Sequence, residues 1–311
     1  MIDELFFIAV SLILLFAGAE ALVRGSASLA LRAGVSSLVV GLTVVAFGTS
    51  SPEMVVSVKS AIAGQGDLAV GNVVGSNTFN IGVILGVAAI VCPIPVHRQI
   101  LRMDAPIALA VAALLVVLLL DDGLGRIEGT LLMAGIVGYT WLNVALARRQ
   151  GVTPSDGEVA TTSRHWAIDL ALVVVGLVVL IVGSRLLVEH AVSLATDLGV
   201  SEAVIGLTIV AAGTSMPELA TSLIAALRKE PDIAIGNVVG SNVFNVLGIL
   251  GVASLVSPLN APGISAVDYA ALMVFTVLML PLLYTGYILH RVEGALLLGL
   301  YGAYLFILWP V

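Results

Sequence analysis

The feature that most constrains this chain is an internal duplication in which matching residues lie 165 positions apart. Residues 71–80 read Gly-Asn-Val-Val-Gly-Ser-Asn-Thr-Phe-Asn, and residues 236–245 differ from them at a single position. The same offset places residues 48–53, Gly-Thr-Ser-Ser-Pro-Glu, on residues 213–218, Gly-Thr-Ser-Met-Pro-Glu. Shared hydrophobicity alone does not produce such matches at one constant offset, so the chain consists of two copies of one structural unit.

Each copy contains enough apolar sequence to cross a membrane five times. The chain is 59% hydrophobic and only 11% charged, whereas an average soluble domain is about 25% charged. A membrane span needs roughly 20 mostly apolar residues, and hydropathy predicts ten such runs: residues 5–24, 37–63, 68–92, 102–120, 126–147, 166–188, 202–227, 233–256, 267–286 and 292–309. The predicted fold is an all-α integral membrane protein with ten transmembrane helices.

An odd number of spans per copy fixes how the two copies are related. The second copy must enter the membrane from the opposite side, as in the inverted repeats of secondary transporters. The longest hydrophilic stretch, residues 148–165, predicts a linker between a first repeat (1–147) and a second repeat (166–311). Ten of the thirteen Lys and Arg residues fall on the linker side. The positive-inside rule therefore predicts a cytoplasmic linker with both termini outside.

The second and seventh predicted spans are each interrupted by a proline that is followed by a glutamate. Proline removes a backbone hydrogen bond from a helix interior, so these spans are predicted to be broken. Ser50 and Ser215 precede Glu53 and Glu218 by three residues, the spacing of a helix-capping box. Capping alone does not explain carboxylates at the bilayer centre, where each costs at least about 2.5–3.5 kcal/mol. We therefore interpret both glutamates as helix-start residues that also bind a cation.

The third and eighth predicted spans carry a second polar pattern. Ser76 and Asn80 match Ser241 and Asn245, and residues four apart share one helical face. Small residues here can also serve only close helix packing, as the neighbouring glycines are expected to do. With the two glutamates, these segments offer carboxylate, hydroxyl and amide oxygens without thiolates or histidines. Such a set suits hard cations, and Ca²⁺ takes about 6–8 oxygen ligands.

Other features exclude several function classes. The single Cys92 excludes an intrachain disulfide and a multi-thiolate metal site. No basic patch with interleaved aromatic residues predicts a nucleic-acid partner. No nucleophile–base arrangement or phosphate loop predicts an enzyme, and no cofactor is expected. Two pairs spaced four apart, Glu20 with Arg24 and Arg185 with Glu189, predict structural ion pairs.

The paired motifs resemble those of the cation/calcium antiporter superfamily, and within it the prokaryotic sodium/calcium exchangers. The resemblance extends over the whole chain. It implies two inverted five-helix repeats with helices 2, 3, 7 and 8 broken around a cation site at the membrane midplane. It implies electrogenic exchange of three Na⁺ for one Ca²⁺ by alternating access, in the inner membrane of a prokaryote, with the first and sixth spans sliding across a rigid core. Within the lipid bilayer, one chain would function as a monomer.

The resemblance also implies roles for individual residues. The Ca²⁺ site would be formed by Glu53, Glu218, Thr49 and Thr214, with Asn80 and Asn245 completing the central layer. Sodium sites would use Ser50, Ser76, Ser215, Ser241 and the backbone carbonyls of Ala46 and Ala211. Some archaeal and potassium-dependent members carry aspartate at the position of Asn245, so the amide here argues against K⁺ co-transport. A Ca²⁺/H⁺ antiporter is the second hypothesis for the function, and a cation channel is the third.

Overall fold

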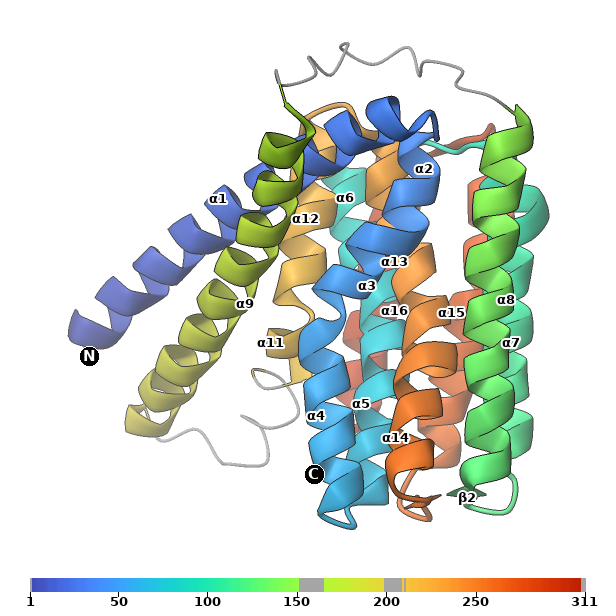
Figure 1. Cartoon of the computed structure of the whole chain (residues 1–311). Helices are drawn as coiled ribbons and strands as arrows, with labels where there is room; N and C mark the ends of the chain where they lie inside the picture. Colours follow the sequence, from blue (N-terminus) through green and yellow to red (C-terminus); the bar gives the residue numbers. More distant parts are fainter. Residues whose placement is uncertain (1, 151–164, 199–208, 210, 309–311) are drawn as a thin grey trace.

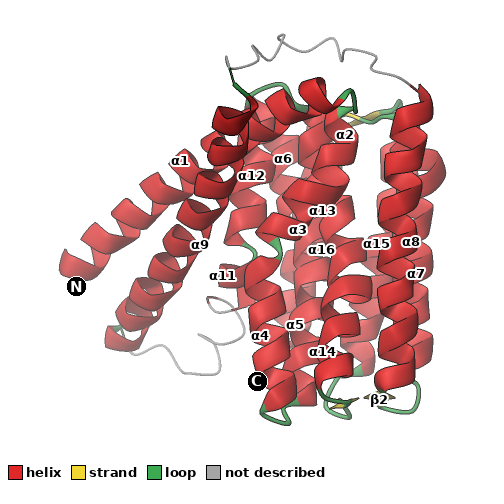
Figure 2. Cartoon of the chain, in the orientation of Figure 1, coloured by secondary structure: helices red, strands yellow, loops and turns green. Residues whose placement is uncertain are grey.

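The computed structural model describes residues 2–150, 165–198, 209 and 211–308, and these are almost entirely helical (Figure 2). Eight of the described helices are long and apolar enough to cross a membrane, and a bent helix pair forms a ninth candidate span. The predicted span 202–227 lies partly outside the described residues. The predicted all-α integral membrane fold is confirmed.

The first repeat contains five spans in chain order. The first span is α1 (Ile2–Ala33), and the second comprises α2 (Ser37–Val40), the π-helical segment η1 (Gly41–Val45), α3 (Ala46–Thr49) and α4 (Ser51–Ile62). The third comprises α5 (Gly66–Phe79), the π-helical segment η2 (Asn80–Leu85) and α6 (Gly86–Val91). The fourth comprises the π-helical segment η3 (Ile100–Asp104) and α7 (Ala105–Leu118), and the fifth is α8 (Arg126–Gln150).

The second repeat follows the same plan. The sixth span is α9 (Trp166–Asp197), and the described part of the seventh comprises α11 (Ala211–Thr214) and α12 (Met216–Leu227). The eighth comprises α13 (Pro231–Phe244), the π-helical segment η5 (Asn245–Leu250) and α14 (Gly251–Val256). The last two spans are α15 (Ala266–Tyr284) and α16 (Arg291–Leu308). The irregularity predicted for the third and eighth spans takes the form of π-helical turns beginning at Asn80 and Asn245.

Equivalent elements of the two repeats run in opposite directions (Figure 1). α1 begins at the lower end of the view and rises, whereas α9 begins at the upper end and descends. Two short antiparallel strand pairs have the same symmetry. β1 (Ile94–Pro95) pairs with β4 (Ile288–Leu289), and β2 (Gly123–Leu124) pairs with β3 (Leu259–Asn260). Each strand pair joins one repeat to the other, so the inverted repeats form a single unit.

The spans differ sharply in burial, as a protein with a lipid-facing surface requires. Within an 18-residue apolar window of the third and eighth spans, Gly66–Val91 and Pro231–Val256, 78% and 83% of the residues are buried, against 11% in Arg291–Leu308. Large apolar side chains on the outer helices remain exposed, among them Trp141, Val292 and Phe306. The most buried helices therefore form the centre of the bundle, and the exposed apolar surface faces lipid.

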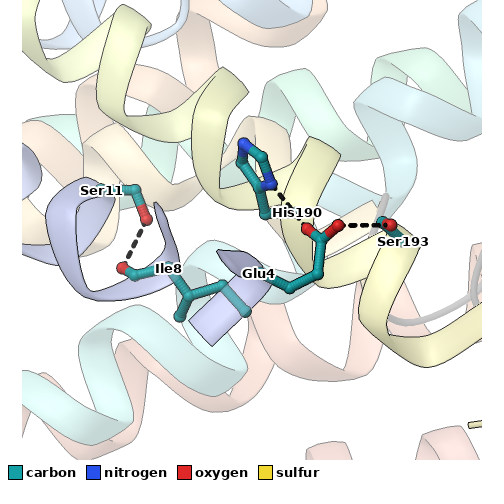
Figure 3. A network of polar contacts seen from close by, with 5 residues as sticks. All are labelled: Glu4, Ile8, Ser11, His190 and Ser193. Carbon is teal, nitrogen blue, oxygen red and sulfur yellow. Dashed lines mark hydrogen bonds and ion pairs between the residues drawn. The ribbon is translucent and has the colours of Figure 1, made fainter. Parts of the chain in front are cut away.

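α1 and α9 pack against each other and extend away from the other helices (Figure 1). A Cβ atom added to Gly18 would lie 2.9 Å from the Gly176 carbonyl oxygen, so only small residues allow this close crossing. At one end, His190 Nδ1 lies 2.6 Å from Glu4 Oε2, and Ser193 Oγ donates to Glu4 Oε1 at 2.9 Å (Figure 3).

Ion pairs connect α1 to α9 and to α12. At the opposite end of the α1–α9 pair, Arg32 Nε donates to Asp169 Oδ2 at 2.5 Å. The predicted pair of Glu20 with Arg24 forms, and Arg228 Nε also donates to Glu20 Oε2 at 2.8 Å, which ties α1 to the end of α12. The other predicted pair is wrong, because Arg185 and Glu189 are not among the ion pairs of the described residues.

Candidate cation site

Two helix breaks place Glu53 and Glu218 in the centre of the bundle. α3 ends at Thr49, α4 begins at Ser51, and the two parts of this span are bent by 47°. A proline in the first turn of α4 and of α12 fits there, because a helix leaves the first N–H groups without partners. Both glutamates therefore lie in the first turn of a helix, and each is only 1% exposed.

The serines before the breaks reach across to the opposite repeat. Ser50 Oγ donates to Glu218 Oε1 at 2.9 Å, and Ser215 Oγ donates to Glu53 Oε1 at 3.0 Å. Neither serine side chain caps its own helix, so the predicted capping boxes are wrong. The hydroxyl groups bind the glutamate of the other copy instead, and this contact brings both helix breaks to one place.

Several oxygen atoms at the centre have no hydrogen-bond partner among the described residues. Each glutamate has one such atom, Oε2, and the same is true of Oδ1 in Asn80 and Asn245 and of Oγ in Ser241 and Oγ1 in Thr214. None of the ion pairs formed by the described residues includes either glutamate. Burying such acceptors without compensation costs free energy. A bound cation would satisfy them together, and the oxygen-only set suits a hard cation.

Four other residues predicted for the site lie in the second, third and seventh spans. Thr49 Oγ1 is engaged by protein groups, at 3.1 Å from the Val45 carbonyl and 3.0 Å from Asn237 Oδ1. The Ala46 carbonyl accepts the Ser50 backbone N–H at 3.1 Å, and Ala211 begins α11 at the equivalent position. Ser76 is buried and lines a cavity next to the site.

Sequence reasoning did not assign roles to two further asparagines that support the glutamates. Asn72 Nδ2 donates to the Glu53 carbonyl at 3.2 Å, and Asn237 Nδ2 donates to the Glu218 carbonyl at 3.3 Å. Each amide also donates to a serine hydroxyl in the same helix as the glutamate, at 2.9 Å in both repeats. These asparagines fix the first turn of α4 and of α12. Their recurrence at an offset of 165 residues was the signal available in the sequence.

The two sides of the site differ in access. A cavity of about 330 Å³ reaches Ser76 and Thr214 and extends to Asp268 at the start of α15. This start lies at the same end of the molecule as the beginning of α1 (Figure 1). On the other side, η1 packs against α13, and a Cβ atom added to Gly240 would lie 2.6 Å from the Leu42 carbonyl oxygen. Among the described residues, the site is therefore approached along α5 and covered along α13.

Comparison with known proteins places this geometry in a family. The family described as "Sodium/calcium exchanger protein" matches residues 4–145 and 168–309, one match in each half of the chain. Among similar relatives, the "Putative antiporter CaxA" of Alkalimonas amylolytica is 37% identical over 318 residues and covers 99% of both chains. The "Sodium/calcium exchanger MaX1" of Methanosarcina acetivorans is 31% identical and covers 96% of this chain and 97% of its own.

A solved structure agrees with the sequence comparisons. The sodium–calcium exchanger NCX_Mj soaked with 2.5 mM Na⁺ and 0.1 mM Ca²⁺ matches with a TM-score of 0.86 at 32% identity, covering 100% of both chains. The family match spans both repeats, and the structural match spans the complete bundle around the paired glutamates. This chain is a multi-pass membrane protein that belongs to the sodium/calcium exchanger family.

Proposed function

We propose that this protein is a secondary active antiporter that exchanges Na⁺ for Ca²⁺ by alternating access. The observation that carries the proposal is the pair of buried glutamates, one from each repeat, each with an unpaired Oε2 and a serine donor from the opposite repeat. The names of relative MaX1 and of the matched structure NCX_Mj support the same pair of ions. No separate cofactor is required, because the ions are the substrates.

The charge of the site supports electrogenic exchange. Glu53 and Glu218 together carry two negative charges when ionised, which balance one Ca²⁺. Asn80 and Asn245 are neutral, so three Na⁺ would leave the same centre with one excess positive charge. We propose a stoichiometry of three Na⁺ for one Ca²⁺, with Ser50, Ser76, Ser215, Ser241 and the carbonyls of Ala46 and Ala211 contributing to Na⁺ sites, and Thr49 and Thr214 to the Ca²⁺ site.

The proposed orientation puts residues 148–165 in the cytoplasm and both termini outside, in the inner membrane of a prokaryote. Basic residues concentrated on the linker side support it. With this orientation, the cavity along α5 would open to the outside, as expected of an outward-open state. Both halves of the site come from one chain, which supports a functional monomer.

Uptake of radiolabelled Ca²⁺ into proteoliposomes tests the proposal. Vesicles are loaded with Na⁺ and diluted into Na⁺-free buffer, and a parallel set carries an outward proton gradient at equal Na⁺. We expect uptake with the Na⁺ gradient. Uptake with the proton gradient alone would move the function to Ca²⁺/H⁺ exchange, and flux that needs no counter-ion would indicate a channel.

The membrane potential tests the proposed stoichiometry in the same vesicles. Three Na⁺ leaving for each Ca²⁺ that enters carry one net positive charge out of the vesicle. An inside-positive potential, set with K⁺ and valinomycin, should therefore accelerate Ca²⁺ uptake, and an inside-negative potential should slow it. Equal rates at both polarities would indicate electroneutral exchange.

A further inference from the structure

Two buried asparagines join the repeats next to the site. Asn77 and Asn242 occupy equivalent positions and are 2% and 5% exposed. Asn77 Nδ2 donates to the Asn242 backbone carbonyl at 3.0 Å, and Asn242 Nδ2 donates to the Asn77 backbone carbonyl at 3.2 Å. The two side chains therefore form a reciprocal pair across the interface between α5 and α13.

Each of these amides also accepts a hydrogen bond from the asparagine that begins the opposite π-helical segment. Asn80 Nδ2 donates to Asn242 Oδ1 at 2.9 Å, and Asn245 Nδ2 donates to Asn77 Oδ1 at 3.0 Å. The remaining amide oxygens, Oδ1 of Asn80 and Oδ1 of Asn245, are buried and have no partner among the described residues. The four side-chain amides thus form one hydrogen-bonded network in which only the Oδ1 atoms of Asn80 and Asn245 lack a partner among the described residues.

The direction of each amide follows from a backbone group. A carbonyl oxygen only accepts, so the atom of Asn242 that faces the Asn77 carbonyl must be Nδ2. Its other atom is then Oδ1, which only accepts, so Asn80 must turn its Nδ2 toward it. Oδ1 is the one amide atom of Asn80 that remains. The same steps apply from Asn77 to Asn245.

We propose that Asn77 and Asn242 are positioning residues that force Asn80 and Asn245 to present oxygen, and not an N–H donor, to the transported cation. This inference rests on the proposed function. It goes beyond that function because two residues that do not touch the ion would set the direction of the Asn80 and Asn245 amides. A reversed Asn80 amide would place two N–H groups against the cation in place of a ligand. The reciprocal bonds to backbone carbonyls make that reversal costly.

The test begins with Asn242→Leu, which keeps the side-chain shape and removes both amide atoms. Ca²⁺ binding to purified full-length protein and Na⁺-driven Ca²⁺ uptake are measured. We expect the Kd for Ca²⁺ to rise about 10-fold or more, because the Asn80 amide would no longer be held with its oxygen toward the cation. Asn143→Leu is the matched control, because Asn143 is a fully buried amide between Tyr139 and Gln99, outside the site. Its Kd should equal that of the wild type.

A double-mutant cycle separates positioning from packing. Asn80→Asp supplies an oxygen in either orientation, so it should improve Ca²⁺ affinity much more in the Asn242→Leu background than in the wild type. Equal fold-changes in both backgrounds would overturn the proposal, as would an unchanged Kd in Asn242→Leu. If Asn242→Leu does not fold, Asn242→Ser replaces it in the same cycle. A wild-type protein without Na⁺-driven uptake would instead refute the proposed function.

Discussion

The site lies between two helices whose sequences are nearly identical and whose surroundings differ. Along α13, Gly240 is covered by η1, with no room for a methyl group beside the Leu42 carbonyl. Along α5, a methyl group added to the equivalent Gly75 would have no atom of the described residues within 4 Å, and Gly75 lines the cavity that reaches the site. Within the described part of the chain, two helices with matching polar residues are therefore packed differently.

The proposed alternating access would require the two repeats to exchange these packing states. If the two repeats exchanged their packing states, η1 would leave α13 and the site would open toward the linker side. The glutamates and amides would keep the same bonds, because these cross the interface symmetrically. We therefore expect the glutamates, serines and asparagines of the site to keep their positions, while the segments that cover the site on either side change places.

The largest loss of transport is expected from removing the charge of either glutamate, because both glutamates belong to the same central site. Glu53→Gln and Glu218→Gln should each reduce Na⁺-driven Ca²⁺ uptake by more than about 100-fold, since losing one partner of a buried charge interaction costs about 3–5 kcal/mol. Glu189→Gln, on the exposed face of α9, is the control and should transport normally. Wild-type flux in either site variant would refute the assignment of the glutamates.

The second prediction tests the open and covered sides by thiol labelling. Ser76→Cys and Ser241→Cys are made in a Cys92→Ser background, so that each variant has one thiol. Ser76 lines the cavity whereas Ser241 is fully buried. A membrane-impermeant methanethiosulfonate added outside should therefore label Ser76→Cys at least about tenfold faster, because thiol reactivity requires access. Equal rates would show that the two sides do not differ in the membrane.

The third prediction concerns the covered glycine. Gly240→Ala should destabilise this conformation by about 1–3 kcal/mol, the usual cost of overpacking, because its Cβ would lie 2.6 Å from the Leu42 carbonyl oxygen. Gly75→Ala adds the same methyl group to the cavity and should leave the melting temperature nearly unchanged. Melting of both variants in detergent, without Ca²⁺, compares them. A larger loss in Gly75→Ala would contradict the described packing.

The smallest effect is expected at the N-cap positions of the two helices, where Gln65 precedes α5 and Glu230 precedes α13. Burial, and then the nearby charge of Asp232, raises the pKa of Glu230 from 4.5 to about 7. The fold therefore favours the protonated carboxyl, so stability linked to Glu230 is present below pH 4.5 and is lost as the pH rises through about 7.

Glu230→Gln makes the two N-caps alike and removes this titration. Its melting temperature relative to the wild type should rise between about pH 5 and about pH 8, the range that spans the raised pKa. Asp197→Asn, an exposed carboxyl change at the end of α9, is the control. A difference that stays constant with pH would show that Glu230 does not titrate in this range.

Much of the fold could be predicted because the duplication and the apolar runs are strong signals. The second span was predicted at residues 37–63 and covers Ser37–Ile62. Helix ends on α1 were predicted poorly: the apolar run ends near Arg24, but the helix continues to Ala33. Hydropathy detects only the lipid-facing part, whereas ion pairs such as Arg32 with Asp169 stabilise the helix beyond it.

The site was predictable in its residue types and less so in its contacts. Glu53 and Glu218 stood out because charge within an apolar span is costly. The serine contacts were assigned to capping because sequence spacing reports only local partners, and the actual partner lies in the other repeat. Close packing was expected at all the paired glycines, yet Gly75 faces a cavity. The two glycines lie in matching sequences, which do not predict which of them is covered by described residues.

A crystal structure of the protein soaked with Ca²⁺ in the absence of Na⁺ would show directly whether Glu53 and Glu218 bind the divalent ion. We expect one strong density peak between the repeats, with Oε2 of Glu53 and Oε2 of Glu218 at about 2.3–2.6 Å, the usual Ca²⁺–oxygen distance. Anomalous scattering after replacing Ca²⁺ with Sr²⁺ would identify the peak as the divalent ion. No peak at this position, or a peak bound by neither glutamate, would show that the two glutamates do not form the Ca²⁺ site.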